Sequence, residues 1–338
     1  MSEKIIPKDE PPYYEDAPRH SYSQTIFGAA ASAGNLLDFN DLQLANLLGV
    51  AGTSTSVAAR IKWGKTSGPF PMLKYGCSFG LMAQIVVTAA LAIERGFTGD
   101  TSVLDGEWGF WKMWGSSFFH PEAITGDLGK KWNLDVVKFK LYPNDGLAHS
   151  FIDGINTLIQ QNEINPKDIE AISIKGDPVL VEPNKAGTDV KSFSDTQFRM
   201  SYLAAVAVYL GRKPDPNWQS PSVYNDPEIR ELMKKITFAL HPRVDELIAR
   251  NFQAGLGPNF HDNIVGMTAK GKLFSIEVSV PRGHYTKPLT DDELKEKFRN
   301  NACYSMIRTD KVERAIEVID NLESVANINE LTALLTIP

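Results

Sequence analysis

The chain has 338 residues, of which 43% are hydrophobic and 22% charged, with a formal net charge of −6. This length allows two domains and a sizeable core, and the acidic balance excludes the basic footprint expected of a nucleic-acid-binding protein. Cys77 and Cys303 are the only cysteines, which is too few for a disulfide scaffold, so we expect a cytoplasmic protein. No charged and then apolar leader opens the sequence, and the longest apolar run, 79–93, is short for a membrane span, so no membrane partner is expected.

The first part of the chain predicts a polar lead-in followed by helices. Residues 1–19 are rich in Pro, Glu and Asp, which is typical of an extended segment. Helices are expected over 24–37, 42–48, 51–62 and 79–95. Aromatic residues crowd the stretch 108–119, and we interpret them as a helical core or a subunit contact.

The pattern changes near residue 136, after which short strands alternate with helices. Strands are predicted over 171–174, 264–268 and 273–280. The last two flank Ala269-Lys270-Gly271-Lys272, which is a hairpin signature, and Thr290 with Glu293 predicts a capping box. Helices are expected over 195–210, 226–239, 294–304, 312–322 and 328–335. The outline is helical, then mixed α+β, then helical again.

The most informative segment runs from Phe139 to His149. Lys140 lies beside a Tyr-Pro turn, and His149 follows next to an amphipathic helix expected over 150–159. A fixed ammonium near an imidazole suits the binding of a carboxylate and the transfer of a proton. Taken alone, the pattern also fits solvated or structural residues, so both interpretations stay open at this point.

Five stretches of the chain carry a resemblance to a known family through their order and spacing. They are His20 with the small-residue helix 28–33, then 44–52, 96–110, 139–153 and 202–207, joined later by 288–290 and 297–298. Together they resemble the 2-methylcitrate dehydratase family, the MmgE/PrpD-type proteins, which also includes cis-aconitate decarboxylase and iminodisuccinate epimerase. The resemblance runs from about His20 to the C-terminus.

The resemblance implies a mixed fold class, α with α/β, in two domains. An all-helical domain is expected from both ends of the chain, residues 20–136 and 285–338. A smaller α+β lid domain, residues 137–284, is expected between them. Relatives are commonly homodimers through their helical domains, so a homodimer is expected, and the aromatic stretch 108–119 is a candidate contact.

The resemblance also implies the chemistry. The family acts without a metal or an organic cofactor, and it moves protons beside carboxylates so that water or CO₂ is lost or a centre is inverted. We therefore expect a cofactor-independent lyase or isomerase acting on a small di- or tricarboxylate. The sequence agrees, because it has no glycine-rich phosphate loop, no Cys-x-x-Cys and no His-Glu-x-x-His, and its histidines are scattered.

Four candidate catalytic residues are carried over from the resemblance: His20, Lys140, His149 and Tyr202. His20 matches a histidine that lines the active site in relatives. Lys140 matches the lysine of a Phe-Lys-x-Tyr/Phe-Pro motif, where an ammonium would hold a substrate carboxylate and stabilise developing charge. His149 would act as acid or base, and Tyr202 would hydrogen-bond the substrate. The alternatives are a surface histidine for His20 and a core tyrosine for Tyr202.

Several positions depart from the family pattern. Where many relatives have Lys-Pro-Leu-His, this chain has Tyr75-Gly76-Cys77-Ser78, and Lys74 lies one position from the expected lysine. Gln197 stands where an arginine is usual, and Arg199 is a candidate to compensate. The candidate substrate-binding residues are therefore Lys74, Tyr75, Ser78 and Arg199.

The family pattern further includes an upstream helical region with an acidic pair closely followed by a histidine, and this sequence begins after it. Two hypotheses remain open. In the first, the chain is the larger part of a split enzyme that a separate short helical subunit completes, or it works with an altered site. In the second, it is a non-catalytic or repurposed relative that binds a carboxylate metabolite or a partner subunit. Retention of Lys140, His149 and Tyr202 favours the enzyme, while the choice between dehydration, decarboxylation and epimerisation stays open.

Overall fold

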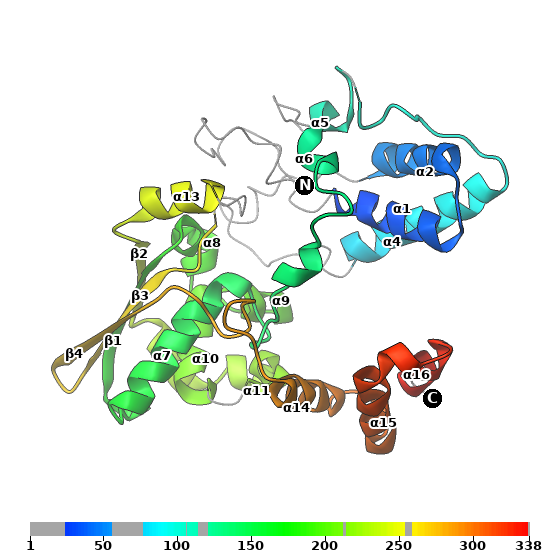
Figure 1. Cartoon of the computed structure of the whole chain (residues 1–338). Coiled ribbons are helices and arrows are strands. Elements are labelled where there is room, and N and C mark those ends of the chain that lie inside the picture. The colour runs from blue at the N-terminus through cyan, green and yellow to red at the C-terminus, as the bar shows by residue number, and fades with distance from the viewer. Residues whose placement is uncertain are drawn as a thin grey trace. The chain divides into compact units, whose positions relative to one another are not determined.

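The structure is a computed structural model, and it describes residues 24–55, 77–105, 107–113, 121–211, 214–253 and 259–336. The chain divides into two compact units, which are described separately (Figure 1). The first comprises Met1–Trp132, Glu182–Asn184 and Arg243–Phe260, and the second comprises Asn133–Val181, Lys185–Pro242 and His261–Pro338. The expected mixture of many helices with a small sheet is confirmed, whereas the expected domain boundaries and the lid arrangement stay a prediction.

Three helices form the core of the first unit: α1 (Thr25–Leu36), α2 (Asp41–Ser54) and α4 (Cys77–Glu94). α2 starts with a capping box, because the Asn40 side chain accepts the Gln43 backbone N–H and the Gln43 side chain accepts the Asn40 N–H. Phe27 packs edge-on against Phe110, with ring centroids 4.8 Å apart. The other helices of this unit are α5 (Phe110–Met113), α6 (Glu122–Thr125) and α13 (Val244–Gln253).

The aromatic stretch predicted as a core or a contact has two different environments in its described part. Phe110 is buried in the first core, whereas Trp108 is exposed. Residues 114–119 of this stretch lie outside the described residues, as do 1–19 and the end of the helix expected over 51–62. Among the helices that are described, none combines the length and the apolar content needed to cross a bilayer.

A four-stranded mixed sheet forms the centre of the second unit, in the order β2-β1-β3-β4. Its strands are β1 (Ile169–Gly176), β2 (Ile236–Leu240), β3 (Asn263–Ala269) and β4 (Lys272–Val278). β1 pairs parallel with β2, and the other neighbours are antiparallel. The predicted hairpin is confirmed, and both turn residues, Lys270 and Gly271, have positive φ, as a two-residue hairpin turn requires.

Two predicted helices are wrong in detail. The helix expected over 226–239 ends early: α12 is Pro227–Met233, and 236–240 form β2. The β-branched and aromatic side chains of Ile236, Thr237 and Phe238 favour a strand, and this strand pairs in parallel with β1. The helix expected over 195–210 is two helices, α9 (Phe193–Phe198) and α10 (Met200–Leu210), because Arg199 between them has an extended backbone.

The helix α7 (His149–Gln161) packs on β3 and β4, and α10 packs against α7 and β2 (Figure 1). Close contact is possible because Gly154 faces the sheet: a Cβ at this position would lie 2.9 Å from a methyl group of Val265. Every α10 residue from Met200 to Val208 is buried. This core holds α7 at a fixed position over the sheet.

The remaining elements of the second unit are short helices and a C-terminal helical segment. The short ones are η3 (Asn133–Val136), η4 (Gly146–Ala148), η5 (Pro166–Asp168), η6 (Pro178–Val181), η7 (Pro216–Gln219), α11 (Pro221–Tyr224) and η8 (Leu322–Ser324), and α8 (Pro183–Ala186) has residues in both units. The C-terminal helices are α14 (Asp291–Ala302), α15 (Thr309–Asp320) and α16 (Asn329–Leu334). The predicted capping box of Thr290 and Glu293 starts α14 and is confirmed.

We expect Ile155→Ala to lower the free energy of unfolding by about 2–5 kcal/mol, because Ile155 is fully buried in the core that contains α7 and the sheet. Leu273→Ala is the matched control, since this leucine is 71% exposed on β4, and it should cost less than about 1 kcal/mol. Urea unfolding of both variants measures the difference. Equal losses would contradict the assignment of this core.

Candidate functional site

The segment before α7 is a sequence of tight turns that places His149 at the first helical position. The Asn144 N–H donates to the Tyr142 carbonyl at 2.9 Å. The Asp145 carboxylate then caps η4 by accepting the Leu147 N–H at 3.3 Å, and α7 continues directly from η4. Asp145 therefore begins the turn that carries His149 into the helix.

Three other parts of the chain hold this segment in place. The Asp145 N–H donates to the Gln197 carbonyl at 3.0 Å, and the Gln219 side chain donates to the Pro143 carbonyl at 2.6 Å. The Lys185 ammonium pairs with the Asp145 carboxylate at 2.6 Å, and both side chains are largely buried. Burial alone would raise the pKa of Asp145, but Lys185 outweighs it and holds that pKa well below its usual range. Asp145 is thus a fixed anion at the base of the segment.

Lys140 lies over the same turns and has capacity to bind an anion. Its ammonium donates to the Asn144 carbonyl at 3.0 Å, which uses one of its three N–H groups. Its aliphatic stem passes over Gly146, where a Cβ would lie 3.6 Å from the lysine Cε. The residue itself is exposed. Because its hydrogen-bond partner is a neutral carbonyl, the positive charge is not neutralised there, and the remaining N–H groups can donate to an anionic ligand.

His149 is buried without a hydrogen bond at one ring nitrogen. It is 3% exposed, and its Nε2 has no partner among the described residues. Burial, and then the nearby charge of Lys140, lowers the pKa of His149 to about 3. The imidazole is therefore neutral near pH 7, and it is available as a proton acceptor.

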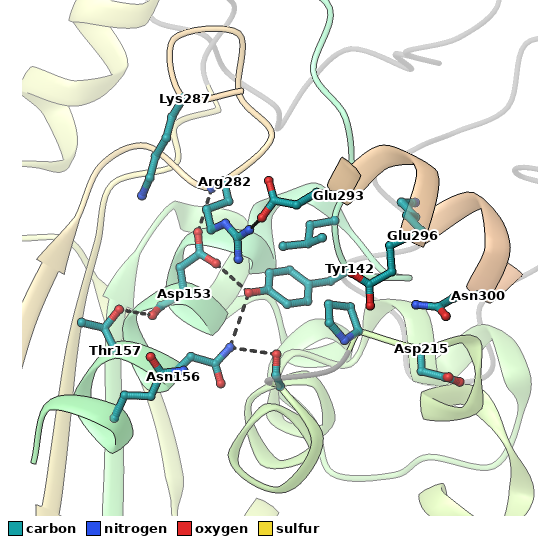
Figure 2. A pocket seen from close by; sticks show the side chains of 15 residues that line it. Tyr142, Asp153, Asn156, Thr157, Asp215, Arg282, Lys287, Glu293, Glu296 and Asn300 are labelled. Atoms are coloured by element: carbon teal, nitrogen blue, oxygen red, sulfur yellow. Dashed lines mark hydrogen bonds and ion pairs between the residues drawn. The ribbon is translucent and has the colours of Figure 1, made fainter. Parts of the chain in front are cut away.

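Tyr142 sets the orientation of the His149 ring. The Tyr142 and His149 rings meet edge to face with centroids 5.1 Å apart. Trp218 stacks on Tyr142 with a centroid distance of 5.7 Å, and the three rings form an aromatic cluster. The Tyr142 hydroxyl donates to one oxygen of the Asp153 carboxylate at 2.6 Å, and the backbone N–H of Arg282 donates to the other oxygen at 2.8 Å (Figure 2). Burial, followed by the Asp153 charge, raises the pKa of Tyr142, so the phenol stays protonated.

A second histidine, His261, lies near this site and was not identified from the sequence. Its Nδ1 is buried without a partner among the described residues, and burial with the nearby Lys138 lowers the pKa of His261 to about 4. The Asn263 amide connects it to α7 by donating to the Ser150 hydroxyl at 2.6 Å and to the His261 carbonyl at 3.0 Å. The only signal in the sequence is the polar run His261-Asp262-Asn263 directly before a buried strand.

A pocket of about 540 Å³ adjoins the cluster, and Tyr142 forms part of its wall (Figure 2). Its lining mixes carboxylates with cations, including Asp153, Glu296 and the ion pair of Arg282 with Glu293. Lys297 lines this pocket and also influences the charge state of His149. Among the described residues, no group of three or more His, Cys, Asp or Glu side chains is arranged to hold a metal ion.

The structure brings Lys140 and His149 together and places two other candidates in the interior of the second unit. Tyr202 is fully buried in α10, and its hydroxyl donates to the Trp218 carbonyl. Arg199 is buried beside Asp195, 3.4 Å from its carboxylate. His20, Lys74 and Tyr75 lie outside the described residues, and of Ser78 only the backbone is described, in α4. The catalytic role of His20 and the substrate-binding roles of Lys74, Tyr75 and Ser78 stay predictions.

The chain belongs to the MmgE/PrpD family: residues 142–324 match the MmgE/PrpD C-terminal domain, and residues 14–119 match the MmgE/PrpD N-terminal domain. The family predicted from the sequence is confirmed. Its curated relatives include the cis-aconitate decarboxylase of Homo sapiens, 25% identical over 332 residues, which cover 96% of this chain and 64% of that protein. The cis-aconitate decarboxylase of Mus musculus is 26% identical over 336 residues, with 96% and 64% covered.

A cis-aconitate decarboxylase-like protein of Aspergillus oryzae is 23% identical over 332 residues, which cover 93% of this chain and 65% of that protein. The chain thus spans just under two thirds of the length of these curated relatives.

We expect the protein to lose stability as the pH falls below about 6.5. His149 and His261 have folded-state pKa values near 3 and 4, so the unfolded chain binds protons at these two histidines first as the pH falls. Below about pH 6.5, each histidine therefore lowers the free energy of unfolding by about 1.4 kcal/mol per pH unit. Urea unfolding at pH 7.5, 6, 5 and 4.5 measures the slope. His149→Gln should remove about half of it, and an unchanged slope would contradict a buried neutral His149.

We expect Lys185→Met to destabilise the protein by about 3–5 kcal/mol, because it leaves the buried Asp145 carboxylate without its counter-ion. The double variant with Asp145→Asn should lose less than the sum of the single variants. Lys191→Met is the control, since the Lys191–Asp189 pair is exposed, and it should cost less than about 1 kcal/mol. Urea unfolding tests this, and strictly additive losses would show that the pair does not act as a unit.

Proposed function

We propose that this chain carries the proton-transfer and carboxylate-binding groups of a cofactor-independent lyase or isomerase that acts on a small di- or tricarboxylate. One observation carries the proposal: the buried, neutral His149 has an unpartnered Nε2 in the electrostatic field of the Lys140 ammonium. The names of the curated relatives support a carboxylate as substrate, since they refer to decarboxylation of cis-aconitate.

Lys140 binds a substrate carboxylate in this proposal. When a proton leaves the carbon next to that carboxylate, negative charge spreads onto its oxygens, and a nearby ammonium stabilises this charge. The segment suits the task because the Lys140 ammonium is held by a hydrogen bond to the Asn144 carbonyl, while Gly146 leaves room for the lysine stem. Little reorganisation is then needed as the charge develops.

His149 accepts or returns the proton. A neutral imidazole is the required form of a base, and the low pKa of His149 keeps it neutral near pH 7. Binding of an anionic substrate near Lys140 opposes the field that lowers this pKa, which makes the imidazole a stronger base when the substrate is present. Dehydration, decarboxylation and epimerisation all begin with similar proton chemistry, so the proposal covers all three.

The other candidates enter the proposal on the family resemblance. His20 takes part in proton transfer and Tyr202 in substrate hydrogen bonding, while Lys74, Tyr75, Ser78 and Arg199 contact the substrate. A homodimer is part of the same proposal. Because Tyr202 and Arg199 have protein partners, a direct role would require those contacts to exchange when the substrate binds.

We expect Lys140→Ala and His149→Gln each to slow proton exchange between substrate and solvent by about 10²–10⁴-fold, because each removes a group that acts in the transition state. Proton NMR of cis-aconitate or citrate in D₂O measures the exchange, and circular dichroism checks the fold. Lys272→Ala, an exposed lysine on β4, is the control and should leave the rate unchanged.

Two outcomes would count against this proposal. An unchanged kcat/KM in Lys140→Ala would remove its central residue. Tight binding of these acids without any deuterium exchange in the wild-type chain would favour a carboxylate-binding role in place of catalysis.

A further inference from the structure

Asn144 has an environment that neither the proton transfer nor the carboxylate binding explains. Its side chain is 6% exposed, and neither its Nδ2 nor its Oδ1 has a hydrogen-bond partner among the described residues. A buried amide has two donors and an acceptor with two lone pairs, and leaving them unpaired is unfavourable. Such a group is rare in a folded protein and indicates a missing partner.

The backbone groups around Asn144 already have hydrogen-bond partners of their own. Its N–H donates to the Tyr142 carbonyl, and its carbonyl accepts the Lys140 ammonium. The carbonyl of Pro143 and the N–H of Asp145 on either side are also bonded. These neighbouring backbone groups are therefore already hydrogen-bonded, and none of them pairs with the Asn144 side-chain amide.

Asn144 also lies in the segment that contains both proposed functional groups. The Lys140 ammonium is 3.0 Å from the backbone carbonyl oxygen of Asn144, and His149 follows five residues later. A ligand carboxylate held by Lys140 would therefore lie beside Asn144, within the reach that a substituent on the next carbon needs to meet its side chain. A carboxylate oxygen only accepts, so it would satisfy Nδ2 and leave Oδ1 unpaired. A methylene or an alkene carbon would satisfy neither atom, whereas a hydroxyl both donates and accepts.

We propose that Asn144 is a specificity-determining residue that binds a hydroxyl group of the ligand and so selects hydroxy-carboxylates over carboxylates that lack the hydroxyl. This inference rests on the proposed function, because Lys140 must hold the ligand carboxylate. It goes further by assigning a substituent of the ligand to one side chain. A site built to hydrogen-bond a hydroxyl discriminates strongly against an analogue without it, because the buried polar atoms are then unpaired.

Citrate and tricarballylate test the assignment, since they are matched tricarboxylates that differ only by the hydroxyl. Isothermal titration of the full 338-residue chain with each acid gives the ratio of dissociation constants. We expect citrate to bind at least about tenfold more tightly to the wild-type chain, and we expect Asn144→Leu to bring the ratio close to one. Asn162→Leu, at the exposed end of α7, is the control and should keep the wild-type ratio. Circular dichroism confirms that each variant is folded.

The outcomes separate this inference from the function on which it rests. Equal wild-type affinities that both fall in Lys140→Ala would overturn the role of Asn144 and leave the carboxylate site in place. A preference for citrate that persists in a folded Asn144→Leu variant would also overturn it. If neither acid binds to the wild-type chain, the proposed function fails together with this inference. Asn144→Ala, a smaller change, should lose the preference as Asn144→Leu does, and it serves if the leucine variant does not fold.

Discussion

The ion pair between Lys185 and Asp145 is the interaction on which the site depends. Asp145 uses one carboxylate oxygen to cap the turn before α7 and the other to bind the buried lysine. A buried charge is tolerated only with a partner of this kind. Because the same segment carries Lys140, Asn144 and His149, this contact helps to hold the three residues of the proposed site in a single geometry. The imidazole of His149 also packs edge-on against Tyr142, whose hydroxyl is hydrogen-bonded to Asp153.

Much of the fold follows from local sequence patterns, and the deviations have physical reasons. The capping boxes at Asn40 and Thr290 and the Lys270-Gly271 turn are short-range signals, and the structure confirms them. The strand β2 was not predicted, because its pairing partner β1 lies about 60 residues earlier in the chain. Periodicity over a short window contains no information about such a partner. The break at Arg199 was not predicted either: its extended backbone ends α9 and begins α10, although its ion pair with Asp195 has the i,i+4 spacing of a continuous helix.

The candidate site was predictable in part. Lys140 and His149 share one short segment, so the sequence predicts that they lie close together, whereas their joint role rests on the family resemblance. His261 joins them only through the Asn263 amide, which connects residues 113 positions apart. Asn144 stands out only in the structure, because neither polar atom of its buried side-chain amide has a hydrogen-bond partner among the described residues. Tyr202 illustrates the reverse case: a residue of the family pattern has its hydroxyl bound to a backbone carbonyl inside the core.

The topology of the sheet has a consequence for how the site appears during folding. The strand that follows His261 is β3, and it reaches its place by pairing with β1, which lies far away in the chain, as does the other neighbour of β1, β2. Long-range pairings of this kind form late and slowly compared with local helices. The two histidines therefore come together only when the sheet is complete, and a partly folded chain with its helices already formed would lack the site.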